Sequence, residues 1–221
     1  LGLADVIVKQ LGQTEDSYTP ASVIRSDGDI SSLNRSRAYK VAEAQDIALS
    51  SESIRSQSAQ KDAMFESPEQ FVESLMPIAE KVAEKYGMDP KAIISQAAVE
   101  TGWGKFVIHK ADGESSHNLF GIKANKGWQG EQAVVDTLEF NNGLPQKQKA
   151  AFRSYSSVED AMEDYGRFIT SQPRYSHAVE NASDAARYTH ALQEAGYATD
   201  PEYARKIMAV YNSDRLSTLM P

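Results

Sequence analysis

Hydrophobic residues recur every three or four positions between Ser67 and Gly87, which predicts an amphipathic helix. Ser67 and Pro68 are typical of the start of a helix, and Gly87 is typical of its end. The apolar face is formed by Phe71, Leu75, Ile78, Val82 and Tyr86. The pair Asp89 and Pro90 repeats the start signal, so we expect a second helix directly after the first.

The apolar spacing changes beyond the second helix. Residues 107–130 are rich in glycine, asparagine, lysine and serine, which indicates a long loop. Two extended segments separated by a turn then predict a β-hairpin, and three more helices follow. The strands are expected at residues 132–140 and 150–157, the turn at residues 141–148, and the helices from Ser157, over residues 183–196 and over residues 200–212. Residues 67–221 are therefore expected to form an α+β, mostly helical domain with a small β-hairpin lobe.

The residues before this domain have a different character. Residues 1–13 resemble the end of an amphipathic helix, with an apolar side formed by Leu3, Val6, Ile7 and Leu11. Residues 14–66 are rich in serine and poor in aromatic residues, which is typical of a linker, and residues 37–49 within it have the spacing of a short helix. Because the chain begins with leucine, we expect it to be a fragment or a processed form.

Composition and charge argue against several classes of function. The net charge is −8, and no cluster of lysine and arginine interleaves with aromatic residues, so a nucleic-acid partner is not expected. No window approaches the ~18 apolar residues of a membrane span, so membrane insertion is not expected. The absence of cysteine excludes disulfides, thiolate metal sites and a cysteine nucleophile.

The motifs of several common catalytic sites are also missing. The four histidines form no ligand pair on one helix face, and no HExxH motif occurs, so a zinc site is not expected. Neither a GxSxG nucleophile turn nor a glycine-rich phosphate loop is found. We therefore expect no metal and no cofactor, and any chemistry would come from carboxylates, hydroxyls and tyrosines.

Glu100 is the first candidate for such chemistry. It lies near the end of the second predicted helix, on the same face as Ile93 and Ala97. The helix dipole at this end disfavours a carboxylate, and burial disfavours it as well, so both favour the protonated form that a general acid requires. Trp103, one turn later, could provide an apolar wall. The alternatives are a structural glutamate paired with arginine, or a side chain turned to solvent.

Glu139 is the second candidate. It lies on the first strand of the predicted hairpin, on the same side as Val135 and Thr137. A carboxylate on a strand opposite an acid on a helix is an arrangement by which many glycosidases straddle a sugar bond. The alternative is a strand residue that faces solvent.

Three short segments resemble one known family. They are AAVETGWGK at residues 97–105, HNLFGIK at residues 117–123 and GYATDPEYA at residues 196–204, and together they resemble the bacterial glucosaminidases, family 73 of the glycoside hydrolases. The resemblance covers residues 67–221. Within the family it is to the flagellar members that pair rod assembly with peptidoglycan hydrolysis, and it implies that residues 1–13 are the end of a rod-scaffolding domain.

The resemblance implies a fold like that of goose-type lysozyme and a role for each matched residue. Glu100 corresponds to the catalytic acid, and Glu139 to a second glutamate whose placement varies in the family. Tyr197 corresponds to an active-site tyrosine, with Tyr203 as the alternative. The loop that floors the cleft corresponds to Asn118, Phe120 and Gly121. Trp103 is expected either to stack on sugars or to belong to the core, and Asp164 either to position substrate or to stabilise the structure.

The expected function is that of an endo-β-N-acetylglucosaminidase that hydrolyses the β-1,4 bond of peptidoglycan glycan strands. Two mechanisms stay open, because Glu139 could activate water with inversion, or the acetamido group of the substrate could attack with retention. One alternative is a lytic transglycosylase of the same fold, and another is a rod-assembly scaffold or cap that only binds the wall. The resemblance also implies a periplasmic location at the flagellar rod, with rod proteins as partners through an N-terminal domain.

Overall fold

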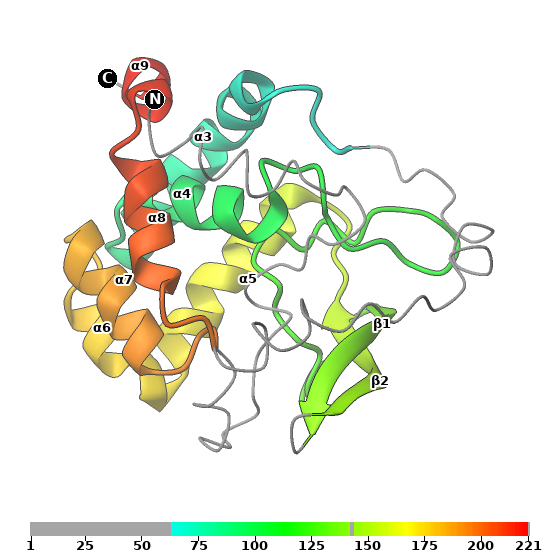
Figure 1. Ribbon diagram of the computed structural model, residues 1–221. Helices are drawn as coiled ribbons and strands as arrows, with labels where there is room; N and C mark the ends of the chain where they lie inside the picture. Colours follow the sequence, from blue (N-terminus) through cyan, green and yellow to red (C-terminus); the bar gives the residue numbers. More distant parts are fainter. Residues whose placement is uncertain (1–62, 142–143, 221) are drawn as a thin grey trace, which may run out of the picture.

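The computed structural model describes residues 63–141 and 144–220, with the backbone alone for residues 136–141 and 144–148 (Figure 1). The expected helix end at residues 1–13, the short helix at residues 37–49 and most of the expected linker lie outside the described residues, so the domain boundaries stay predictions. Within the described part of the chain, no helix is long and apolar enough to cross a membrane.

The first two predicted helices are confirmed with their end signals. Helix α3 runs over Pro68–Tyr86 and helix α4 over Pro90–Thr101. The hydroxyl of Ser67 accepts a hydrogen bond from the Gln70 amide at 3.2 Å, and the carboxylate of Asp89 accepts bonds from the first turn of α4. The apolar faces of α3 and α4 then pack against each other in the core.

The hairpin is longer than the sequence predicted. Strand β1 (Gln132–Asn141) pairs antiparallel with strand β2 (Leu144–Arg153), so the expected turn at residues 141–148 was wrong. The polar run at residues 146–149 carries no hydrophobic alternation, yet its backbone completes the ladder opposite β1. The expected second strand also ended too late, because residues 154–157 leave the sheet to approach the next helix.

The remaining helices follow the hairpin in the chain, and α6, α7 and α8 lie on the side of α4 away from it (Figure 1). Helix α5 packs against α3, and α8 packs against both α4 and α7. The short elements η3, α6 and α9 were not predicted, because each is too brief to show a helical period. Their bounds are α5 Val158–Ser171, η3 Pro173–Tyr175, α6 Ser176–Glu180, α7 Ala185–Glu194, α8 Tyr203–Tyr211 and α9 Asp214–Leu219.

Five tyrosines are almost fully buried among these helices. Each has less than 2% of its surface exposed, although every hydroxyl needs a hydrogen-bond partner once it leaves water. They are Tyr165, Tyr175, Tyr188, Tyr197 and Tyr203. The mostly helical domain with a two-stranded lobe is thus confirmed, and the hydroxyl groups of these five tyrosines lie in its interior.

Candidate active site

Glu100 lies inside the domain, in the last turn of α4. Only 1% of its surface is exposed. Gly102 ends the helix in the left-handed conformation at φ 57°, so the chain turns away directly after the carboxylate. Tyr203, the first residue of α8, donates its hydroxyl proton to Oε1 of Glu100 at 2.8 Å. The alternative of a carboxylate turned to solvent is therefore wrong.

Behind this pair, a chain of buried hydrogen bonds joins four helices, α8, α4, α5 and α7. Nε2 of Gln96 donates to the hydroxyl oxygen of Tyr203 at 2.9 Å. The hydroxyl of Tyr165 donates to Oε1 of Gln96 at 2.5 Å, and the Tyr188 hydroxyl lies 2.5 Å from that of Tyr165. All of these side chains are at most 1% exposed. Glu100 is thus held by a polar network that ends in the interior of the domain.

The network has one direction of donation. A tyrosine hydroxyl has a single proton, and Tyr165 gives its proton to the carbonyl oxygen of Gln96, so the amide nitrogen of Gln96 faces Tyr203. Tyr203 accepts there and therefore donates to Glu100. Burial, and then the negative charge of Glu100, raise the pKa of Tyr203 well above its usual value, so this hydroxyl keeps its proton. Oε1 of Glu100 is thus the acceptor in this pair.

Tyr197 lies beside this network but points elsewhere. Its ring stacks on Tyr203 with the centroids 5.7 Å apart and the planes at 15°. Its hydroxyl donates to the backbone oxygen of Phe120 at 2.8 Å. The tyrosine that donates to Glu100 in the described contacts is thus Tyr203, which the sequence analysis named as the alternative to Tyr197. The catalytic role expected for Tyr197 stays a prediction.

The loop of residues 118–122 is closed by the side chain of Asn118. Its Nδ2 donates to the backbone oxygens of Ile122 and Arg153, each at 2.9 Å, and its Oδ1 accepts from the Ile122 amide at 3.0 Å. Gly121 takes φ 59°, which favours glycine. Phe120 stacks on Tyr165 with the ring centroids 3.9 Å apart. These contacts explain the motif structurally, and substrate contact by Asn118, Phe120 and Gly121 stays a prediction.

The Gly-Trp-Gly segment after Glu100 is a run of three left-handed residues. Trp103 has φ 62° and Gly104 has φ 83°, after Gly102. A Cβ atom at Gly104 would lie 2.4 Å from the ring of Phe65, so only glycine fits. Trp103 is half-buried, and its ring meets Phe71 edge-on at 5.8 Å. This supports the core role for Trp103, and sugar stacking by its exposed part stays a prediction.

Asp164 is a buried ion-paired carboxylate on α5. Its Oδ2 accepts from Nη1 of Arg153 at 2.6 Å and from the Tyr155 hydroxyl at 2.8 Å, and its Oδ1 accepts from Nη2 of Arg167 at 2.5 Å. Burial alone raises the pKa of Asp164, but the hydrogen bonds from Arg167, Tyr155 and Arg153 outweigh it and hold this pKa below its usual value. These partners favour the structural role, while substrate positioning stays a prediction.

Glu139 is placed by its backbone alone. It lies on β1 opposite Gln146 of β2, which confirms its strand position, and its side chain is outside the described residues. The carboxyl separation from Glu100 therefore stays open, as does its catalytic role. Across the described residues, no group of three or more histidine, aspartate or glutamate side chains could hold a metal ion.

The residues that hold Glu100 in place were missed by the sequence analysis. Gln96 precedes Glu100 by one helical turn, on the same face of α4, and this spacing was an available signal. Tyr165 and Tyr188 gave no local signal, because they look like ordinary apolar-face residues of α5 and α7. Arg153, the partner of Asp164, was also missed.

Comparison with known proteins gives one matching family over most of this domain. Residues 76–216 match the Glucosaminidase family, described as mannosyl-glycoprotein endo-beta-N-acetylglucosaminidase. The chain is 40% identical over 210 residues to the peptidoglycan hydrolase FlgJ of Vibrio parahaemolyticus, covering 95% of this chain and 68% of that protein. It is also 40% identical over 216 residues to the FlgJ protein of Vibrio cholerae, again covering 95% of this chain but 63% of that protein.

A solved structure shares the fold. The glycoside hydrolase domain of Salmonella typhimurium FlgJ, truncated at its C-terminus, superposes with a TM-score of 0.58 and 41% sequence identity. The match covers 69% of this chain and 99% of that one. The chain thus covers almost all of that truncated domain, whereas it spans about two thirds of the longer relatives.

Proposed function

Because this chain belongs to the Glucosaminidase family, we propose that it is a glycoside hydrolase that cleaves the glycan strands of peptidoglycan, with Glu100 as its general acid. The bond proposed is the β-1,4 linkage after N-acetylglucosamine, cut within the strand. The names of the two Vibrio relatives support peptidoglycan as the substrate, and the family description supports an endo-acting glucosaminidase.

The single observation that carries this proposal is the buried pair of Glu100 and Tyr203. A glutamate that is 1% exposed loses most of its hydration, and this loss disfavours its charged form. Tyr203 fixes Oε1, so the proton on Oε2 has a defined position. An acid that holds its proton in a fixed direction meets the geometric requirement of general acid catalysis.

In the proposed reaction, Oε2 of Glu100 protonates the glycosidic oxygen as its bond to the anomeric carbon breaks. Positive charge develops on the sugar ring in an oxocarbenium-like transition state, and water completes the hydrolysis. Tyr203 then stabilises the carboxylate that Glu100 becomes, because its hydroxyl still donates to Oε1. The hydrogen bond that stabilises the carboxylate of Glu100 is thus in place before the reaction begins.

The capture of the anomeric carbon has two proposed routes. Glu139 could activate a water molecule with inversion, or the acetamido oxygen of the substrate could attack with retention. A carboxyl separation of roughly 6.5–9.5 Å would favour the first route, and a wider gap would favour the second or closure of the lobe. A separation of roughly 5–5.5 Å would contradict both routes, because it favours a protein nucleophile. Proton NMR of the sugar released in the first minutes distinguishes inversion from retention by its anomeric signal.

The products distinguish this proposal from a lytic transglycosylase. Hydrolysis adds water and leaves a reducing N-acetylglucosamine end, whereas a transglycosylase leaves an anhydro sugar. Mass spectrometry of soluble fragments from purified cell wall therefore tests the reaction. Anhydro ends from the wild type would overturn the proposed hydrolysis.

We also propose that the protein acts in the periplasm at the flagellar rod. The resemblance to flagellar members of the family supports this location, and the FlgJ relatives are compatible with it. Rod proteins are the proposed partners, through an N-terminal domain that ends within residues 1–13. A scaffold that only binds the wall would retain rod proteins in a pull-down and release no fragments from cell wall.

A further inference from the structure

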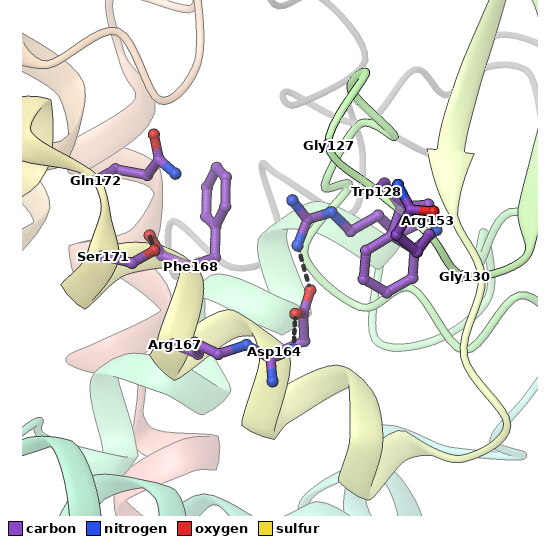
Figure 2. Close-up of a pocket in the computed structure, with 10 residues that line it drawn as sticks. Gly127, Trp128, Gly130, Arg153, Asp164, Arg167, Phe168, Ser171 and Gln172 are labelled. Carbon is purple, nitrogen blue, oxygen red and sulfur yellow. Dashed lines mark hydrogen bonds and ion pairs between the residues drawn. The ribbon is translucent and has the colours of Figure 1, made fainter.

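A pocket of about 400 Å³ lies between α5, the end of β2 and the loop of residues 127–130 (Figure 2). None of the residues that line it belongs to α4, the helix of Glu100. The side chains that bear on its chemistry are Trp128, Arg153, Asp164, Arg167, Phe168 and Gln172. The pocket is thus a second polar site in the domain, separate from the network around Glu100.

The pocket carries an excess of positive charge. Arg153 and Arg167 both bind Asp164, at 2.6 Å and 2.5 Å, so two guanidinium groups face one carboxylate. Asp164 keeps its negative charge, because the same hydrogen bonds hold its pKa below the usual value. One positive charge is left over, in a chain whose net charge is −8. The local field therefore favours an anion.

Arg153 is fixed in place between two aromatic rings. Its guanidinium carbon lies 4.6 Å from the centre of the Trp128 ring and 5.2 Å from that of Phe168. Nη1 is bound to Asp164, while Nε is buried without a hydrogen-bond partner. Figure 2 shows the guanidinium reaching from β2 across the pocket towards Phe168. Held in this way beside the guanidinium of Arg167, Arg153 contributes a fixed positive charge to the pocket, which suits a carboxylate.

The walls suit a ligand that is larger than an inorganic anion. The Trp128 indole is held by its own N–H, which donates to the backbone oxygen of Glu131 at 2.8 Å, so its face forms a rigid wall. Phe168 forms the wall opposite, and the amide of Gln172 points towards Phe168 from the rim (Figure 2). Flat apolar walls around a charged base fit a carboxylate on a peptide or sugar.

We propose that this pocket binds a carboxylate of the peptide stems that the glycan strands carry. This inference rests on the proposed function, since peptidoglycan supplies a substrate in which peptide carboxylates accompany the sugar bond. It deepens that function by assigning Arg153 and Arg167 to the recognition of stem-bearing strands.

The pocket and Glu100 are braced against the same loop. The backbone oxygen of Arg153 accepts from the side chain of Asn118, and its amide donates to the oxygen of Ile122 at 2.9 Å. At the other side of the loop, Tyr197 donates to Phe120 and stacks on Tyr203, the partner of Glu100. A stem carboxylate in the pocket would thus be held at a fixed distance from the proposed acid.

The test compares stem-bearing glycan fragments with the same fragments stripped of their stems by an amidase. In Arg167→Gln, the ratio of kcat/KM on stem-bearing to stripped substrate should fall roughly fivefold, because the surplus charge is lost while the buried Arg153–Asp164 pair remains. The matched control is Arg187→Gln, since Arg187 is another exposed arginine paired with an aspartate three residues before it, outside the pocket. Its ratio should equal that of the wild type.

A binding measurement that needs no catalysis completes the test. A free stem tripeptide is titrated into the whole chain while the indole N–H signal of Trp128 is followed by NMR, with Trp128→Phe used for assignment. Shifts that saturate in the wild type and weaken in Arg167→Gln support the site. An unmoved Trp128 signal, or an unchanged ratio in Arg167→Gln, would overturn it. A wild type that cleaves neither substrate but still binds the tripeptide would refute the proposed function and support the pocket.

Discussion

The hydroxyl of Tyr203 donates to Oε1 of Glu100 at 2.8 Å, although 103 residues separate them in sequence. The contact joins the first residue of α8 to the last turn of α4. It fixes Oε1 of a buried carboxyl group, and in the proposed mechanism Oε2 carries the proton. The proposed chemistry depends on this pair, and the first three predictions below test it.

Replacing Glu100 by glutamine should abolish most of the hydrolytic activity. The amide cannot supply the proton, and loss of a general acid costs about 10²–10⁴-fold in rate. The fold should persist, because the side-chain carbonyl of glutamine can still accept from Tyr203. Zymograms and fragment release from purified cell wall measure activity, and thermal melting measures the fold.

The matched control for this change is Glu163→Gln. Glu163 also accepts from a tyrosine hydroxyl, that of Tyr86 at 2.7 Å, but its side chain is 41% exposed. This variant should release fragments at the wild-type rate. If Glu100→Gln digested the cell wall in the zymogram as well as Glu163→Gln, Glu100 could not be the general acid.

Replacing Tyr203 by phenylalanine should move the pH profile of the reaction. The hydroxyl stabilises the ionised form of Glu100, so its loss favours the protonated form. A general acid works only while protonated, and the alkaline limb of kcat/KM should therefore move to higher pH. The maximal rate should also fall, because Oε1 loses the donor that stabilises the carboxylate formed in the reaction.

Tyr211→Phe controls for the loss of a hydroxyl from α8. Tyr211 donates to Oδ2 of Asp89 at 2.8 Å, so the same helix offers a second tyrosine–carboxylate bond remote from Glu100. Its pH profile should follow the wild type. An alkaline limb that stays in place in Tyr203→Phe would contradict the direction of donation inferred for the network.

Replacing Gln96 by methionine should lower the stability of the fold. It should also move the alkaline limb of kcat/KM, but by less than Tyr203→Phe does. The change removes one hydrogen bond from each of the Tyr165 and Tyr203 hydroxyls, which keep their bonds to Tyr188 and Glu100, and each lost bond costs about 0.5–1.5 kcal/mol. Urea unfolding measures the loss, and kcat/KM against pH measures the limb. Ser95→Ala is the control, because Ser95 is also buried on α4 but bonds only to Lys91 in the described contacts. A profile identical to that of Ser95→Ala would reduce Gln96 to a structural residue.

The sequence could indicate Glu100 because its signals are local. The helix end, the apolar face and the Gly-Trp-Gly segment all lie within one stretch of the chain, and the start signals Ser67 and Asp89 held in the structure. The partners of Glu100 could not be found in this way. Gln96 meets Tyr203 across 107 residues and Tyr165 across 69, so only the packing of α4, α5 and α8 brings them together.

Two other differences have physical causes as well. The second strand of the hairpin begins at Leu144, where the sequence is polar and contains Pro145, because its backbone pairs with β1 along the whole ladder without apolar alternation. The last large helix begins at Tyr203 and not at Pro201, since Asp200 accepts from the Glu202 amide in a turn before it. Aspartate followed by proline thus predicted the start of this helix two residues too early.

Asp164→Asn should destabilise the protein in a manner that depends on pH. The pKa of Asp164 is held below its usual value, so its ionised form adds stability above the usual aspartate pKa, and this contribution is lost as pH falls through the lowered value. At neutral pH the variant leaves Arg153 buried without its counter-charge, which costs about 3–5 kcal/mol. The difference in melting temperature between wild type and variant should therefore shrink as the solution is acidified.

Asp160→Asn is the control, since Asp160 also has a lowered pKa but lies exposed at the start of α5 and accepts from Ser156. A melting difference for Asp164→Asn that stays constant with pH would show that the charge of Asp164 does not stabilise the fold.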